Sequence, residues 1–218
     1  QSTAKTLMSA SGTPCCGTPL PNRNRTHPSR RVTMVAMTVT DADLDVVREQ
    51  LGRTPRGVVD IAYRTPDGAP AVIKTAPKLP DGAPFPTLYF LPDPRLTAEA
   101  SRLEVAHVMK WMEQRLADDE TLQKDYRAAH EHYLATRNEM EDLGTQFSGG
   151  GMPERVKCLH VLIAYALAEG PERVRFGTEA VAMAAEHGKL RGSAIPEEWP
   201  TVGDLGIDMA QFDFSNAG

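Results

Sequence analysis

Residues 57–75 read GVVDIAYRTPDGAPAVIKT and contain the clearest pattern in the chain. β-branched and aromatic side chains fill residues 57–64 and 71–75, as is typical of strands. The Pro-Asp-Gly sequence at 66–68 is a turn signal that reverses the chain between them. The stretch therefore predicts a β-hairpin. Because a two-stranded hairpin alone is marginally stable in water, we expect it to pack against helices.

The segments on either side of the hairpin extend this prediction. Four prolines within residues 76–86 exclude a central strand there, and residues 87–91 predict a third strand. Upstream, Thr40 and the acidic first turn that follows it predict the start of a short helix that ends at Gly52.

The downstream half of the chain is predicted to be helical. Residues 97–143 contain neither proline nor glycine and predict two antiparallel helices, the second capped by Asp118 or Asp119. A third long helix is predicted from Pro153 to Ala168, and a short helix over 178–186. The predicted fold class is α+β, with a small antiparallel sheet (hairpin plus third strand) packed on three main helices and an irregular C-terminal tail.

The composition divides the chain into three parts. Residues 1–36 contain five basic residues and no acidic ones, among many polar residues, and we expect a disordered leader or non-native extension whose deletion leaves the melting temperature unchanged. Residues 37–190 are predicted to form a single α+β domain. Residues 191–218 are predicted to form an irregular C-terminal tail, with Trp199 and Leu205 as anchors.

The overall charge argues against several classes of partner. Lys and Arg number 24 against 29 Asp and Glu, which gives a net charge of -5, and residues 37–218 alone carry -10. An acidic protein of this kind is not expected to bind nucleic acid or an anionic membrane. No run of 18 apolar residues is present. The three cysteines form no recognisable disulfide framework, so we expect a cytoplasmic protein.

The residues before the third predicted helix form a candidate anion site. Gly149, Gly150 and Gly151 would expose backbone N–H groups at the helix start, and Arg155 and Lys157 would add positive charge. A phosphate-type ligand is the expected occupant. The alternatives are that the glycines form a simple connector, or that a carboxylate of the chain itself pairs with these bases.

Cysteine, histidine and glutamate side chains are the other candidate site residues. On a continuous helix Cys158 and His160 would point roughly 200° apart, so no shared metal ion and no cofactor is expected. We expect Cys158 to be a core thiol, His130 and His132 to lie on the surface, and His107 to lie in the core. Glu99 and Glu104 are expected to pair with Arg102 or to cap helices. The sequence identifies no catalytic nucleophile.

Five segments, in order along the chain, resemble the actinobacterial domain-of-unknown-function 501 family. Their residue-by-residue sequence resembles that of a corynebacterial member. They are residues 52–59, 72–91, 101–104, 126–130 and 150–160. The resemblance implies no established activity. Some relatives carry cysteines where this chain has Thr65, Asp67 and Asp93, so a zinc or iron–sulfur site of four soft ligands cannot be carried over.

Two functions of different classes follow from the sequence. The first is a binding or regulatory module for a small anionic ligand at residues 149–157. The second is an interaction protein of the cell-division or envelope machinery, whose contact surface would be the acidic helices at 97–143. The family resemblance supports the second function only by association, because in relatives the genes of this family lie beside a gene of the division machinery.

Overall fold

The structure, a computed structural model, describes residues 39–216. The predicted leader at 1–36, Cys15 and Cys16 lie outside the described residues, as do the last two positions of the chain.

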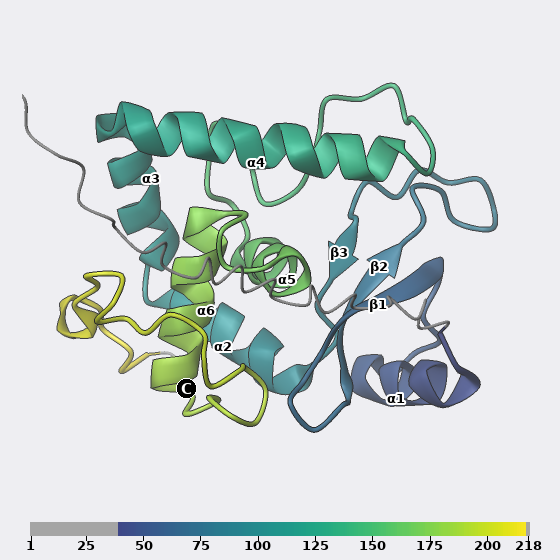
Figure 1. The fold of residues 1–218 in the computed structure, drawn as a ribbon, viewed down its shortest axis with the longest axis horizontal. Helices are drawn as coiled ribbons and strands as arrows, with labels where there is room; N and C mark the ends of the chain where they lie inside the picture. The colour runs from purple at the N-terminus through teal and green to yellow at the C-terminus, as the bar shows by residue number, and fades with distance from the viewer. Residues whose placement is uncertain (1–38, 217–218) are drawn as a thin grey trace, which may run out of the picture. The chain divides into compact units, whose positions relative to one another are not determined.

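The predicted hairpin and third strand form one antiparallel sheet of order β1–β2–β3 (Figure 1). Its strands are β1 (Val58–Arg64), β2 (Pro70–Thr75) and β3 (Tyr89–Phe90). Ile73 of β2 lies opposite both Ile61 and Phe90, which sets the register of the three strands. At the hairpin turn Gly68 has a φ of 91°, a conformation that glycine adopts without strain.

Six α-helices and one short 3₁₀ helix accompany the sheet. They are α1 (Asp41–Leu51), α2 (Pro94–Val105), α3 (Val108–Asp118), α4 (Glu120–Asn138), α5 (Leu159–Glu169), α6 (Arg175–His187) and η1 (Met209–Gln211). The predicted α+β class is therefore confirmed, although the described part of the chain has six α-helices where the sequence predicted three main and two short ones.

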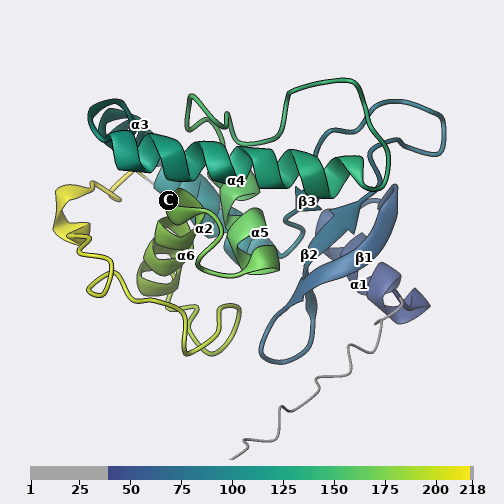
Figure 2. The same cartoon turned by 45° about the horizontal axis from the view of Figure 1, so that its top comes forward.

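Helix α5 is the centre of the core. Seven of its 11 residues are buried and none is exposed, and it contacts α2, α6 and β3 (Figures 1 and 2). Its closest neighbour is α6, where Gly177 packs so tightly that a Cβ atom there would lie 2.3 Å from the carbonyl oxygen of Leu162. A helix that is apolar on almost every side is stable in water only when neighbouring elements bury it on several sides.

Local capping signals in the sequence are confirmed. Thr40 and Asp43 form a reciprocal capping box at the start of α1, and Gly52 ends that helix with a φ of 64°. Asp119 caps α4 by accepting hydrogen bonds from the backbone N–H groups of Thr121 (2.8 Å) and Leu122 (3.1 Å).

Two helix predictions were wrong. The predicted first helix of the 97–143 region is divided into α2 and α3, because His107 adopts a left-handed conformation (φ 62°) between them. That residue is exposed, not in the core as predicted. The helix predicted from Pro153 begins only at Leu159, because residues 150–157 form a closed loop with hydrogen bonds from Lys157 N–H to Gly150 O (2.7 Å) and from Arg155 N–H to Gly151 O (2.9 Å).

The C-terminal segment has little regular structure but packs on the core. Trp199 is only 7% exposed, and its indole N–H donates to the carbonyl of Thr178 in α6 at 3.3 Å. Leu205, the second expected anchor, is partly buried against the core.

Within residues 39–216, no helix is both long and apolar enough to cross a membrane.

Candidate functional site

A cavity of about 660 Å³, here called the central pocket, lies where the end of α1, the β3–α2 segment and the start of α5 meet. Most of its lining side chains are apolar. They are Gln50, Leu51, Thr87, Tyr89, Phe90, Leu91, Pro92, Pro94, Thr97, Ala98, Cys158, His160 and Val161. Pockets of this size and composition are typical of small-molecule sites.

Cys158 and His160 meet Glu104 at the border of this pocket. The ligand-type atoms of the three side chains lie within 4.8 Å of one another, and we call them the Glu-Cys-His cluster. The expectation that Cys158 and His160 point apart was wrong, because Cys158 is in extended backbone (φ −155°, ψ 111°) just before α5 begins. Cys158 is also half-buried, so the expected core thiol is corrected to a residue that borders a cavity.

Hydrogen bonds hold the cluster in place. One carboxylate oxygen of Glu104, from α2, accepts the backbone N–H of Leu159 at 2.8 Å and lies 3.2 Å from His160 Nδ1. The Nε2 atom of His160 lies 3.4 Å from the Ser101 hydroxyl. Glu104 thereby caps α5, a different helix from its own. Of the two predicted roles, helix capping is observed and pairing with Arg102 is not.

The charges within the cluster depend on one another. Hydrogen bonding to the Cys158 sulfur and then to Glu104 raises the pKa of His160 to about 10, although burial opposes the shift. Burial raises the pKa of Glu104, but the hydrogen bonds from His160 and Leu159 outweigh it and the net shift is downward. The imidazole of His160 is therefore protonated at neutral pH.

Gln50, one of the residues that line the central pocket, has an unsatisfied polar atom. The side-chain Nε2 of Gln50 donates to the carbonyl of Pro70 at 2.9 Å, which fixes the orientation of the amide. Its Oε1 is buried and has no hydrogen-bond partner among residues 39–216. A buried acceptor without a donor costs about 1–3 kcal/mol, so such atoms need an explanation.

Arg102, another expected site residue, is not part of the Glu-Cys-His cluster. Its Nη1 lies 2.5 Å from Glu99, in the predicted pair, and the other oxygen of Glu99 lies 2.7 Å from His187 Nδ1. Asp67 and Asp93 are also separate from the cluster: Asp67 accepts a hydrogen bond from Thr65, and Asp93 pairs with Arg95 at 2.8 Å.

The five residues expected to bind an anion line a second cavity of about 610 Å³, here called the glycine-loop cavity. Gly149, Gly150, Gly151, Arg155 and Lys157 are thus brought together, but not at a helix N-terminus, because α5 begins only at residue 159. Across residues 39–216, neither base forms an ion pair, although the carboxylate-bearing Glu154 also lines this cavity.

The histidines of α4 also differ from expectation. His130 is buried at 8% exposure, and its Nδ1 lies 2.9 Å from the Ser148 hydroxyl at the edge of the glycine-loop cavity. Burial is the main cause that lowers its pKa, so the ring is neutral at pH 7. His132 is half-buried, 3.5 Å from Glu169. The surface location predicted for this pair was wrong for His130.

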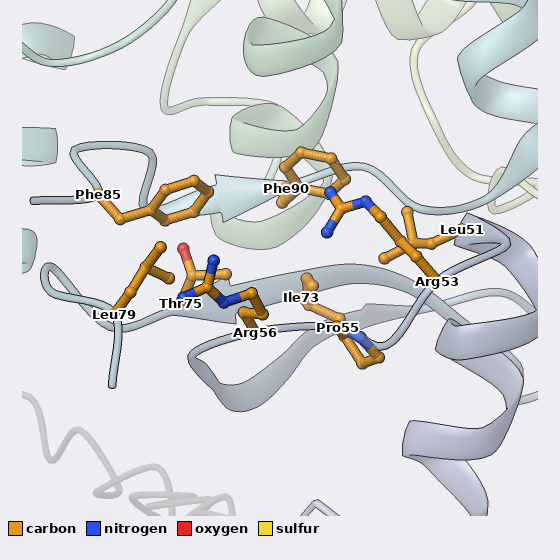
Figure 3. Close-up of a pocket in the computed structure, with 9 residues that line it drawn as sticks. All are labelled: Leu51, Arg53, Pro55, Arg56, Ile73, Thr75, Leu79, Phe85 and Phe90. Carbon is orange, nitrogen blue, oxygen red and sulfur yellow. The ribbon is translucent and has the colours of Figure 1, made fainter. Parts of the chain in front are cut away.

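A smaller cavity of about 180 Å³ adjoins the central pocket, with Leu51 and Phe90 common to both linings. Figure 3 shows Phe85 and Phe90 on the side of β3, with the side chain of Arg53 reaching in from the end of α1. Arg56, at the same cavity, pairs with Asp81.

The central pocket and Gln50 were not predicted from the sequence. No local signal could have identified them, because the lining residues come from three distant segments and most are ordinary apolar residues. The only usable signal was the Cys-x-His spacing at residues 158–160. That spacing was misinterpreted, because the predicted helix started at Pro153 and so included Cys158, whereas α5 begins at Leu159.

Comparison with known proteins adds the family. The family model described as "Protein of unknown function (DUF501)" matches residues 61–182, more than half of the chain. The chain belongs to the DUF501 family. The DUF501 match includes the Glu-Cys-His cluster and the glycine loop, but Gln50 precedes it. No curated protein and no solved structure matched the chain. The narrower expectation of a corynebacterial member stays a prediction.

Proposed function

We propose that this DUF501 protein is a binding module for a small organic molecule that occupies the central pocket. The cavity volume of about 660 Å³ suits a compact ring system. The apolar walls from β3, α2 and α5 would bury the body of such a ligand, and that burial supplies most of the binding free energy.

The observation that carries the proposal is the buried, unpartnered Oε1 atom of Gln50. Its amide orientation is fixed by Pro70, and a ligand that displaces the covering side chains would reach this oxygen with a donor. A ligand with an N–H or O–H group at that end would remove the desolvation cost that the free protein bears. The expected ligand class is therefore an apolar ring compound with one hydrogen-bond donor.

A pair of probes tests this proposal. Indole and benzofuran have nearly the same shape, but only indole carries an N–H donor. Titration of the full chain, followed by calorimetry or ligand-observed NMR, should show indole binding about tenfold more tightly, because only indole pairs with Gln50. Equal affinities, or no saturable binding of either probe, would contradict the proposal.

Substitution of the wall provides the control. Ala98 lies in α2 and lines the pocket, so the bulk of Ala98→Trp should project from its wall and abolish indole binding by obstruction. Ala117→Trp introduces the same side chain at an exposed position of α3 and should leave binding unchanged. Loss of binding in both variants would show that the probe does not report on the central pocket.

Binding of a phosphate-type anion in the glycine-loop cavity is a second candidate function. The specific observation in its favour is that Arg155 and Lys157 line one cavity with the three glycines and have no ion-pair partner among residues 39–216. Phosphate should raise the melting temperature by mass action. Arg155→Ala should remove that increase, and Lys124→Ala, a change at an exposed base of α4, should not. No increase in the unmodified protein would exclude this function.

The expected alternative, an interaction protein that uses the acidic helices at 97–143, stays a prediction of the family resemblance.

A further inference from the structure

We infer that Glu104, Cys158 and His160 form a binding site for a divalent metal ion of the zinc class, with one coordination position left open toward the central pocket. The inference starts from the side chains themselves. Sulfur, imidazole nitrogen and carboxylate oxygen are the three donor types that zinc takes from proteins, and here their atoms lie within 4.8 Å of one another.

The fold fixes these ligands before any ion binds. Glu104 belongs to α2, and its carboxylate is held by the Leu159 backbone N–H at 2.8 Å. Cys158 and His160 are the chain neighbours of Leu159, so this hydrogen bond holds the Glu104 carboxylate beside the backbone that carries both side chains. The Ser101 hydroxyl, 3.4 Å from His160 Nε2, can orient the ring as an outer partner.

Metal binding at these side chains is coupled to proton release, because a metal-bound imidazole nitrogen and a metal-bound thiolate carry no proton. A divalent ion that binds there would displace the protons of His160 and Cys158, and these would be released to the solvent.

The number of ligands indicates the type of site. Structural zinc sites are closed by four protein ligands, whereas sites with three leave a position for water or a ligand. Two of the three side chains, Cys158 and His160, border the central pocket. This inference therefore deepens the proposed function, because the open position would face the same ligand that Gln50 contacts from another part of the lining.

Cobalt(II) is the probe for the ion, since it takes zinc sites and reports its ligands by absorption. The full chain should be untagged, stripped with chelator, and carry Cys15→Ser and Cys16→Ser so that Cys158 is the only thiol. Addition of cobalt(II) should give a 1:1 complex with a sulfur-to-cobalt charge-transfer band in the near ultraviolet. Zinc(II) should abolish that band by competition.

Two substitutions and a matched control complete the test. Cys158→Ser should remove the charge-transfer band, and His160→Asn should weaken cobalt affinity by at least about 10–100-fold. His132→Asn changes another half-buried histidine that faces a carboxylate, and should have no effect. In the unsubstituted chain, zinc(II) should shift the NMR signals of the His160 ring, a measurement that does not depend on the folding of any variant.

The inference is overturned if cobalt(II) does not bind stoichiometrically, if the band persists in Cys158→Ser, or if zinc(II) leaves the His160 signals unchanged. Indole binding is measured separately on the chelator-stripped protein. Loss of metal binding with indole binding intact overturns only the metal site, whereas equal affinity for indole and benzofuran overturns only the ligand pocket.

Discussion

His160 has a charge state that depends on two partners from different parts of the chain. Cys158 precedes it by two residues, and Glu104 comes from α2. The hydrogen bond to Cys158 and then the one to Glu104 raise the pKa of His160 to about 10 against the effect of burial. A raised histidine pKa means that the protonated form contributes to stability.

Glu104→Gln should lower the pKa of His160 toward its ordinary value of 6.5, because the carboxylate that hydrogen-bonds to the ring loses its charge. NMR titration of the His160 ring in chelator-treated protein measures this directly. Glu120→Gln, at the exposed start of α4, is the control and should leave the titration unchanged. An unchanged midpoint in Glu104→Gln would show that Glu104 does not influence the ring.

The interaction of His160 with Glu104 predicts that the stability of the protein depends on pH. The contribution of protonated His160 is complete below the unfolded pKa of about 6.5 and disappears as the pH rises toward about 10. Unfolding free energies of the metal-free protein should therefore fall across that window, and fall less steeply in Glu104→Gln.

At the scale of elements, an ion pair joins α1 to the hairpin. Arg64 of β1 contacts the two carboxylate oxygens of Asp43 at 2.6 and 2.9 Å, and Asp43 also belongs to the capping box of α1. The hydrogen bonds from Arg64 hold the pKa of Asp43 well below its usual range, although burial opposes them.

Asp43→Asn should destabilise the protein by about 1–2 kcal/mol at pH 7, since both the ion pair and the helix cap are weakened. A carboxyl with a lowered pKa stabilises the fold above its unfolded pKa of about 3.8 and loses this effect as the pH falls. Denaturation at several pH values should show the variant and the parent converging in acid. Asp45→Asn, which breaks an exposed pair with Arg48, should cost much less.

The contact between α5 and α6 depends on the absence of a side chain at Gly177. An added Cβ would lie 2.3 Å from Leu162 O and 2.8 Å from Val174, and both positions are in the packed core. Gly177→Ala should therefore destabilise the protein by about 1–3 kcal/mol, measured by chemical denaturation. Gly203→Ala has room for the methyl group, with its nearest contact at 3.6 Å, and should be nearly neutral. Equal unfolding free energies of the two variants would mean that α5 and α6 can move apart to admit the methyl group without loss of stability.

At the scale of the whole molecule, the C-terminal segment is part of the core. Trp199 is 7% exposed and hydrogen-bonds to α6, and the Arg191 guanidinium donates to the carbonyls of Glu197 at 2.9 Å and Trp199 at 2.5 Å. The segment without regular helices is thus tied to the domain by burial and by carbonyl contacts.

Trp199→Ala should cost about 3–5 kcal/mol, as is usual for removal of a buried aromatic side chain. Unfolding should remain a single transition when followed by circular dichroism and by fluorescence of Trp111, because the segment and the helices share one core. Phe147→Ala removes an aromatic side chain that is 81% exposed and should have little effect. A separate early transition in the parent protein would show that the segment unfolds independently.

The sequence by itself determined the features that depend on neighbouring residues. The hairpin follows from strand residues around a turn signal, and the starts of α1 and α4 follow from caps that bond within three residues. These are local interactions, so composition and spacing are enough to identify them. The same holds for the α+β class, which follows from the order of these elements.

Only the tertiary structure decided the candidate site. The start of α5 is set by loop hydrogen bonds between Gly150 and Lys157 and by the carboxylate of Glu104, not by the helix propensity of residues 153–158. That shift turns Cys158 toward His160, and the packing of α2 on α5 supplies the third side chain. Gln50 reaches the same pocket from α1, although it precedes Cys158 by more than one hundred residues in sequence. Contacts of this range arise from burial of the whole core, which no local pattern encodes.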